Sequence, residues 1–155
     1  KIDMSSLDLR YANLASAKLV KTNLRLANLN CACLDSADLS FADLTQACFG
    51  PEEGEAASLV GANLSGADLT KADLGGTDLS KTRFVDACLV NADLRGANLR
   101  DANLTGANLS GAQLDGNLTG ANLTRANLSG AILGELNLEL AIFHETTMPD
   151  GSIRS

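Results

Sequence analysis

The chain has 155 residues, of which 45% are hydrophobic and 3% aromatic, and its formal net charge is −7 at pH 7. This length corresponds to one domain, and a negative charge with dispersed Lys and Arg argues against direct nucleic-acid binding. No stretch approaches about 18 consecutive apolar residues and no signal-peptide pattern is present, so we expect no membrane association.

From Met4 to Phe49 an apolar residue recurs at every fifth position. A small residue, most often Ala, stands two positions before most of these centres. Asp or Asn often stands directly before the centre, so the unit reads A-[DN]-L-x-x. A period of five matches neither an α-helix nor a flat strand, because both would carry successive Leu side chains away from a common core. The spacing instead predicts a chain that turns a corner once per unit and points every Leu at one axis.

The repeat lapses between Gly50 and Ala56, where Gly54 occupies a centre position. Gly, Pro and three Glu residues mark a turn or surface loop, so we predict that residues 50–56 leave the repeat while Leu59 returns to the core. A loop that projects from a regular scaffold is a place where a partner could recognise the protein. The candidate protein-interaction residues are therefore Pro51, Glu52, Glu53 and Glu55. An insertion that the fold merely tolerates is the alternative interpretation.

The five-residue period resumes at Leu59, runs to Leu114, and restarts at Leu118 after one residue is lost near residues 115–117. We interpret this deletion as a local bulge at which Gly116 absorbs a tightened corner. If the coils stack every 20 residues throughout, Asp alternates with Asn and Arg in one outer column. That column would contain Asp3, Asn23, Asp43, Asn63, Arg83 and Asn103.

The unit A-[DN]-L-x-x covers nearly the whole chain and resembles the pentapeptide-repeat family. The resemblance implies an all-β fold in a single domain, residues 1–155: a right-handed quadrilateral β-helix of about seven to eight four-sided coils. At roughly 4.8 Å per coil, this is a rod on the order of 36 Å long. The ending Met148–Ser152 is similar to the terminus of cyanobacterial members, some of which are implicated in regulating heterocyst differentiation.

The sequence contains no recognisable catalytic constellation. His144, the single histidine, lies outside the core positions, and the Cys and His spacing matches no zinc pattern. The Gly residues recur at corners rather than in a phosphate-binding loop. Asp73 and Asp93 are expected to be vertical neighbours, but such ladders serve the repeat itself. We therefore predict that the chain is not an enzyme and has no catalytic residue, cofactor or metal site.

The four cysteines do not form a disulfide pattern. Stacking every 20 residues would place Cys48 and Cys88 on one face but roughly 9.6 Å apart, which is too far for a disulfide. Reduced thiols favour a cytoplasmic location. A removed targeting segment for the thylakoid lumen or the periplasm stays an open alternative.

Three functions remain open. The first is a scaffold or regulatory module that binds an unidentified protein partner. The second is implied by the resemblance, since some family members mimic B-DNA and bind DNA gyrase. In this chain a net charge of −7 is spread over roughly 36 Å, a charge density about threefold lower than that of duplex DNA. The centres are also mostly Leu, whereas those of gyrase-binding members are largely Phe. The third is a structural module of a larger protein.

The two ends of the repeat carry larger apolar residues than its middle. We expect these residues to plug the open ends of the core: Ile2, Leu7, Leu136 and Leu140. The ends of a solenoid present unpaired edges, so we also expect end-to-end self-association.

Overall fold

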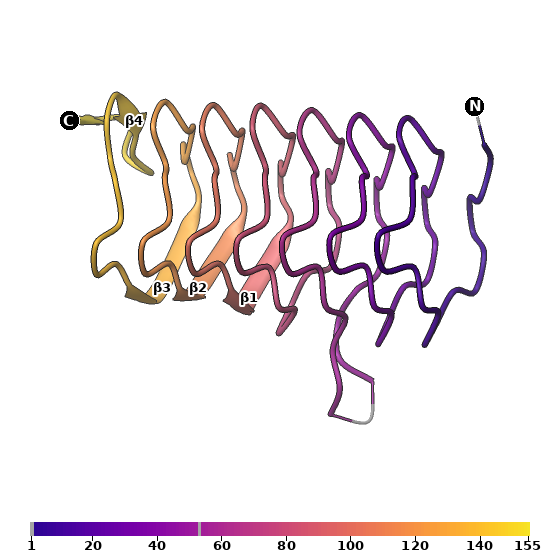
Figure 1. Ribbon diagram of the computed structural model, residues 1–155. Helices are drawn as coiled ribbons and strands as arrows, with labels where there is room; N and C mark the ends of the chain where they lie inside the picture. Colours follow the sequence, from indigo (N-terminus) through magenta and orange to yellow (C-terminus); the bar gives the residue numbers. More distant parts are fainter. Residues whose placement is uncertain (1, 53) are drawn as a thin grey trace.

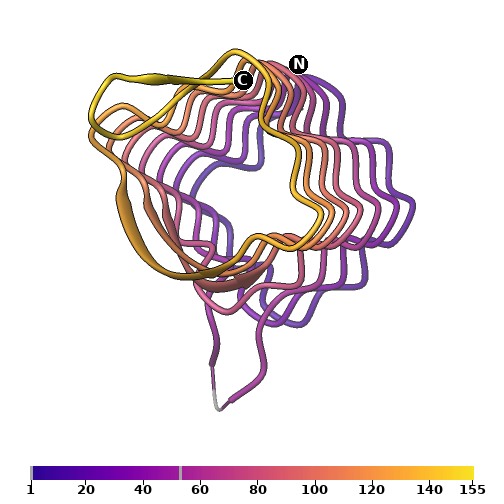
Figure 2. The same ribbon diagram turned by 90° about the vertical axis from the view of Figure 1, so that its left-hand side faces the viewer.

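The computed structural model describes residues 2–52 and 54–155, which form a continuous four-sided solenoid (Figures 1 and 2). Parallel pairing along one outer column defines eight stacked levels, so the chain winds through the expected seven to eight coils. The residues of this column are Asp3, Asn23, Asp43, Asp68, Cys88, Asn108, Asn127 and Thr147.

One unit shows how the repeat makes a corner. Leu24 is fully buried, and its N–H donates to the carbonyl of Asp43 in the next coil at 2.7 Å. The side chain of Asn23 accepts the Arg25 N–H at 3.2 Å, and the Ala27 N–H closes the turn on the Leu24 carbonyl at 3.0 Å. The second corner residue of most units has a φ near +60°. The Asp or Asn thus caps the turn, Leu fills the core, and the small residue lets the wall come close to it.

Most contacts between coils are isolated bridges, and longer strands form along one corner and at the C-terminal end. Strands β1 (Asp93–Asn98), β2 (Gln113–Asn117) and β3 (Ile132–Asn137) pair in parallel in the order β1-β2-β3 (Figure 1). Strands β4 (Thr146–Thr147) and β5 (Ile153–Arg154) form an antiparallel pair. The described part of the chain has no helix of the length and apolar character that a membrane span requires.

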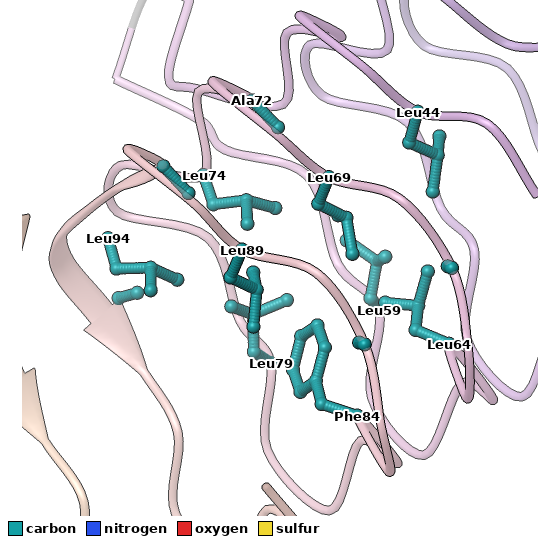
Figure 3. Packing of buried hydrophobic residues seen from close by; sticks show 14 of the residues in the cluster. Leu44, Leu59, Leu64, Leu69, Ala72, Leu74, Leu79, Phe84, Leu89 and Leu94 are labelled. Carbon is teal, nitrogen blue, oxygen red and sulfur yellow. The ribbon is translucent and has the colours of Figure 1, made fainter. Parts of the chain in front are cut away.

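Four columns of inward side chains, most of them Leu, fill the interior (Figure 3). Phe84 lies between Leu64 and Leu104 in one column, because the residues directly before these three pair with one another in order. All three side chains are fully buried. Burial of each such side chain is worth roughly 1.5–3 kcal/mol, and the expected 20-residue stacking is confirmed for this part of the chain.

The 20-residue stacking is wrong where the chain leaves the wall at residues 50–56. Asp43 pairs with Asp68 and Cys48 pairs with Asp73, so the step between coils is 25 residues here. One unit lies outside the wall, and every later residue is displaced by one face relative to the expectation. The expected column is therefore wrong beyond Asp43, and Asp no longer alternates with Asn. Cys48 and Cys88 lie on different faces, which corrects the expectation that they share one.

A second change of register lies between β1 and β2. Arg95 pairs with Asp115 and Ala97 pairs with Gly116, which leaves Gly96 bulged between them. The Gly96 N–H donates to the Asp115 carboxylate at 2.6 Å. The step between coils falls to 19 residues at this level. The bulged residue is therefore Gly96 on the preceding coil rather than Gly116 as expected, because the longer coil must accommodate one residue without a partner when it pairs with the shorter one.

The expected plugging of the ends is wrong for three of the four residues. Ile2, Leu7 and Leu140 are 59%, 45% and 77% exposed, and Leu136 is half-buried. The last coil surrounds an apolar opening of about 20 Å³. Leu136 packs against the end of the core and lines this opening. The other three side chains lie beside the core ends without closing them, because no further coil packs against them within the described residues.

End-to-end self-association stays a prediction, since exposed apolar side chains gather at these ends. The sedimentation coefficient of the chain should rise with protein concentration, and Leu140→Glu should abolish the rise, because a charge cannot be buried cheaply between two ends. Leu26→Glu is the matched control, since Leu26 is also an exposed corner residue with a φ near +60° but lies on the wall. An equal effect of both substitutions would contradict association through the end.

Candidate interaction surface

Residues 50–52 and 54–56 project from one corner of the solenoid as a narrow loop (Figures 1 and 2). Phe49 and Leu59 on its two sides are fully buried. The Ala57 N–H donates to the Phe49 carbonyl at 3.2 Å and brings the two ends of the loop together. Gly54 is exposed and has a φ of 90°. The loop thus leaves and rejoins the wall at one point, and its neighbours remain in the core.

The four candidate interaction residues have different environments. Glu52 and Glu55 exchange backbone hydrogen bonds of 2.8 and 3.1 Å, which form an antiparallel pair within the loop. Pro51 and Glu55 are exposed, whereas the side chain of Glu52 is 33% exposed. Glu53 lies outside the described residues.

Arg10, two coils before the loop, holds Glu52 against the wall. Its Nη1 lies 2.9 Å from Glu52 Oε1, and its Nη2 lies 2.8 Å from Asp8 Oδ2. Hydrogen bonds from Arg10 lower the pKa of Asp8 to about 2, and the two carboxylates, Asp8 foremost, raise the pKa of Arg10. The thiol of Cys31 donates to the Glu55 carbonyl at 3.1 Å. Three side chains of the first two coils thus form the support of the loop.

We call this side of the molecule the loop edge. It comprises residues 50–52 and 54–56, the outer column that precedes this corner, and the two corner residues that follow each centre of that column. The members of the column are Asp8, Asn28, Cys48, Asp73, Asp93, Gln113 and Ile132.

Negative charge is concentrated on the loop edge. Its described residues include seven carboxylates and two guanidinium groups, which give a formal charge of −5, whereas the whole chain carries −7. The opposite edge has four basic and three acidic residues and a formal charge of +1. The charged residues of the loop edge are Asp8, Arg10, Glu52, Glu55, Asp73, Asp93, Arg95, Asp115 and Glu135. Those of the opposite edge are Lys18, Lys21, Asp38, Arg83, Asp86, Arg125 and Glu145.

Two hollows lie along the loop edge. One, of about 350 Å³, is bounded by Pro51, Asp73, Gly75, Gly76, Asp93 and Arg95. The other, of about 840 Å³, lies over the corner formed by β1, β2 and β3 and includes Gly96, Gly116 and Glu135 in its lining. Glycine at these corner positions leaves no side chain to fill the surface, so the loop stands beside the smaller hollow, which Asp73 and Asp93 line.

The titratable groups around the smaller hollow interact with one another. Asp73 and Asp93 are vertical neighbours, as expected. Hydrogen bonds from Arg95 lower the pKa of Asp93, while partial burial, and then the carboxylate of Asp73, raise the pKa of the Cys48 thiol. The residues outside position 1 and position 53 include no group of three potential metal ligands. His144 is exposed on another side of the solenoid. The described residues of this edge thus carry paired charges, and the Cys48 thiol is not activated.

Sequence reasoning identified the loop but missed its surroundings. Arg10, Cys31, Asp73 and Asp93 belong to the same surface as Pro51 and Glu55, although up to 83 positions separate them in the chain. The paired signal of Asp8 and Arg10, repeated as Asp93 and Arg95, was present in the sequence. The 25-residue coil places both Asp–Arg pairs in one column, and only this placement shows that they belong to one surface.

A family model described as pentapeptide repeats matches the chain in eight copies, over residues 8–49, 57–96, 84–116 and 117–150. None of the curated proteins matches it. Among solved structures, HetL, a pentapeptide repeat protein involved in heterocyst differentiation regulation from the cyanobacterium Nostoc sp. strain PCC 7120, is 38% identical. That match covers 98% of this chain and 68% of HetL, with a TM-score of 0.38.

Two further solved structures are similar to the chain. Rfr23, from the cyanobacterium Cyanothece 51142, is 35% identical over 73% of this chain and 64% of its own, with a TM-score of 0.42. QnrB1, a plasmid-mediated fluoroquinolone resistance protein, is 20% identical over 88% of this chain and 67% of its own, with a TM-score of 0.47. The chain thus spans about two thirds of the length of these structures.

Proposed function

This chain belongs to the pentapeptide-repeat family, and we propose that it is a non-catalytic scaffold or regulatory protein that binds a partner protein through the loop edge. Members of the family form right-handed quadrilateral β-helices and are generally structural or interaction modules rather than enzymes. The solenoid supplies a rigid wall, and the loop supplies a feature that the repeat itself does not require. The partner is a protein with a basic surface.

The unequal distribution of charge carries this proposal. Asp and Asn on all four faces cap turns of the repeat, as Asn23 and Asp43 do by accepting N–H groups two residues later. That role accounts for charge on every face, but it does not account for Glu52 and Glu55, which belong to no repeat unit. A protein partner with clustered Lys or Arg side chains would be attracted to this edge and oriented by it.

Affinity capture from an extract of the native host tests the proposal. Wild-type protein and Glu139→Lys should capture the same partner, whereas Glu55→Lys should lose it. The two substitutions change the net charge equally, but Glu139 is an exposed residue outside the loop edge. Because exposed charges are screened by salt, capture should also weaken as ionic strength increases. Equal capture by all three proteins would contradict the proposed surface.

A DNA-mimicking protein that binds DNA gyrase is the second candidate, and the acidic loop edge favours it. A net charge of −5 along roughly 36 Å is one charge per about 7 Å, whereas duplex DNA has one per about 1.7 Å. Because this charge density is well below that of DNA, we expect the purified chain at micromolar concentration to leave the supercoiling activity of gyrase unchanged. Clear inhibition that Glu55→Lys weakens would make gyrase the partner.

A further inference from the structure

Arg10 is held in one orientation by its own neighbour in the chain. Asp8 Oδ1 accepts hydrogen bonds from the backbone N–H and the Nε of Arg10, at 3.2 and 2.9 Å, while Asp8 Oδ2 accepts one from Nη2 at 2.8 Å. These bonds leave Nη1 free to point away from Asp8. Nη1 reaches Glu52 Oε1 at 2.9 Å, across 42 positions of the sequence. The guanidinium is thus oriented by Asp8 toward the loop, and little side-chain freedom is lost when it binds Glu52.

Glu52 faces the wall rather than the solvent. Its Oε2 is shielded from solvent and accepts no hydrogen bond within the described residues, and Arg10 provides its salt bridge there. The backbone of Glu52 pairs with Glu55, whose carbonyl also accepts the Cys31 thiol. Because this oxygen is shielded while the side chain as a whole is 33% exposed, solvent compensates only in part for the loss of Arg10. Glu55 and Pro51 remain exposed.

The same local arrangement occurs once more on the loop edge, without a loop. Asp93 and Arg95 occupy the same column positions as Asp8 and Arg10, and Arg95 Nε lies 2.9 Å from Asp93 Oδ1. Arg95 forms no hydrogen bond or ion pair with the described residues of the loop, although it lines the smaller hollow together with Pro51. The chain therefore contains its own control, in which the Asp–Arg pair is present and the contact with Glu52 is not.

We propose that Arg10 is a positioning residue that latches the loop to the wall through Glu52, and that Glu52 acts within the molecule while Pro51 and Glu55 face the partner. This assignment of roles rests on the proposed function, but the latch itself is a property of the free chain. Asp8 orients Arg10, Arg10 holds Glu52, and the Glu52–Glu55 pair transmits that position to the exposed part of the loop. A partner then meets a loop that is already ordered, which lowers the entropic cost of binding.

Amide hydrogen exchange at Glu55, detected by NMR on the free protein, tests the latch. Arg10→Ala should accelerate this exchange about three- to fivefold, the range expected for one partly exposed ion pair, while Arg95→Ala leaves it unchanged. Glu52→Gln should have the effect of Arg10→Ala, and the double variant should be no faster than either single variant. High salt should accelerate exchange in the wild type and not in Arg10→Ala.

Three results would overturn the latch. They are unchanged exchange in both Arg10→Ala and Glu52→Gln, equal acceleration by Arg95→Ala, or additive effects in the double variant. Glu52→Gln keeps the proposal testable if Arg10→Ala disturbs the first coil, because Glu52 lies outside the wall. Exchange at buried amides of the central coils serves as the measure of global stability.

The capture experiment separates failure of the latch from failure of the proposed function. If the latch positions the loop, Arg10→Ala and Glu52→Gln should weaken capture to the same extent, and Glu55→Lys should abolish it. If Arg10→Ala and Glu52→Gln accelerate amide exchange as expected but no loop variant changes capture, the latch is retained and the interaction surface is refuted. Loss of capture in Glu55→Lys with unchanged exchange in Arg10→Ala would retain the surface and refute the latch.

Discussion

Leu104→Ala is expected to lower the free energy of unfolding by about 2–5 kcal/mol, the range for truncation of a buried Leu. Leu104 is fully buried, and its column continues to Phe84 on one side and Leu123 on the other. The walls around it are fixed by hydrogen bonds between coils, such as Leu104 N–H to Asn122 O at 2.8 Å. A narrow tube of this kind cannot collapse around the cavity, so the loss should fall in the upper part of the range. Urea unfolding followed by circular dichroism measures it.

Arg25→Ala is the control for this substitution. Arg25 is an exposed corner residue, and its backbone carbonyl, which accepts the Ser6 N–H at 2.8 Å, is retained in the variant. The free energy of unfolding should change by no more than about 0.5 kcal/mol. Similar losses in Leu104→Ala and Arg25→Ala would mean that the assignment of inward and outward positions is wrong.

Gly116→Ala is expected to be the most damaging substitution of a glycine. Gly116 has a φ of 129°, a conformation that costs a residue with a side chain about 1–3 kcal/mol. A Cβ atom there would lie 2.6 Å from the Ala97 carbonyl oxygen, a backbone atom that cannot rotate away. The strands β1 and β2 would have to separate at the bulge. The loss of stability should therefore exceed the conformational cost alone.

Gly130→Ala provides the comparison. Gly130 has a φ of 65°, and a Cβ atom there would meet no heavy atom within 4 Å. Residues with side chains, including Lys71 and Arg125, adopt φ values of 58° and 56° at equivalent corners. Its substitution should cost no more than about 1 kcal/mol. If thermal unfolding shows equal losses for both glycines, close packing at the β1–β2 bulge is not what requires Gly116.

Much of the fold could be predicted because each unit satisfies its own requirements locally. The five-residue period distinguishes inward from outward positions, and the column of Leu64, Phe84 and Leu104 lies in a part of the chain where the period is unbroken. The interruption around Gly54 is visible for the same reason, since a glycine cannot fill a core position. Pro51, Glu52 and Glu55 could therefore be assigned to one surface segment without any structure.

What lies next to the loop was decided by the tertiary structure alone. The stacking register is cumulative, so it depends on how many residues the chain spends outside the wall before it rejoins the hydrogen-bond ladder. That number makes one coil 25 residues long and places Asp68 over Asp43, while the residue missing near Gly116, opposite the bulge at Gly96, shortens a later step to 19. The acidic loop edge and the contact between Arg10 and Glu52 follow from these steps. A repeat determines the side chain's direction, but only the closed coils determine its neighbour, because parallel pairing joins residues that are far apart in the sequence.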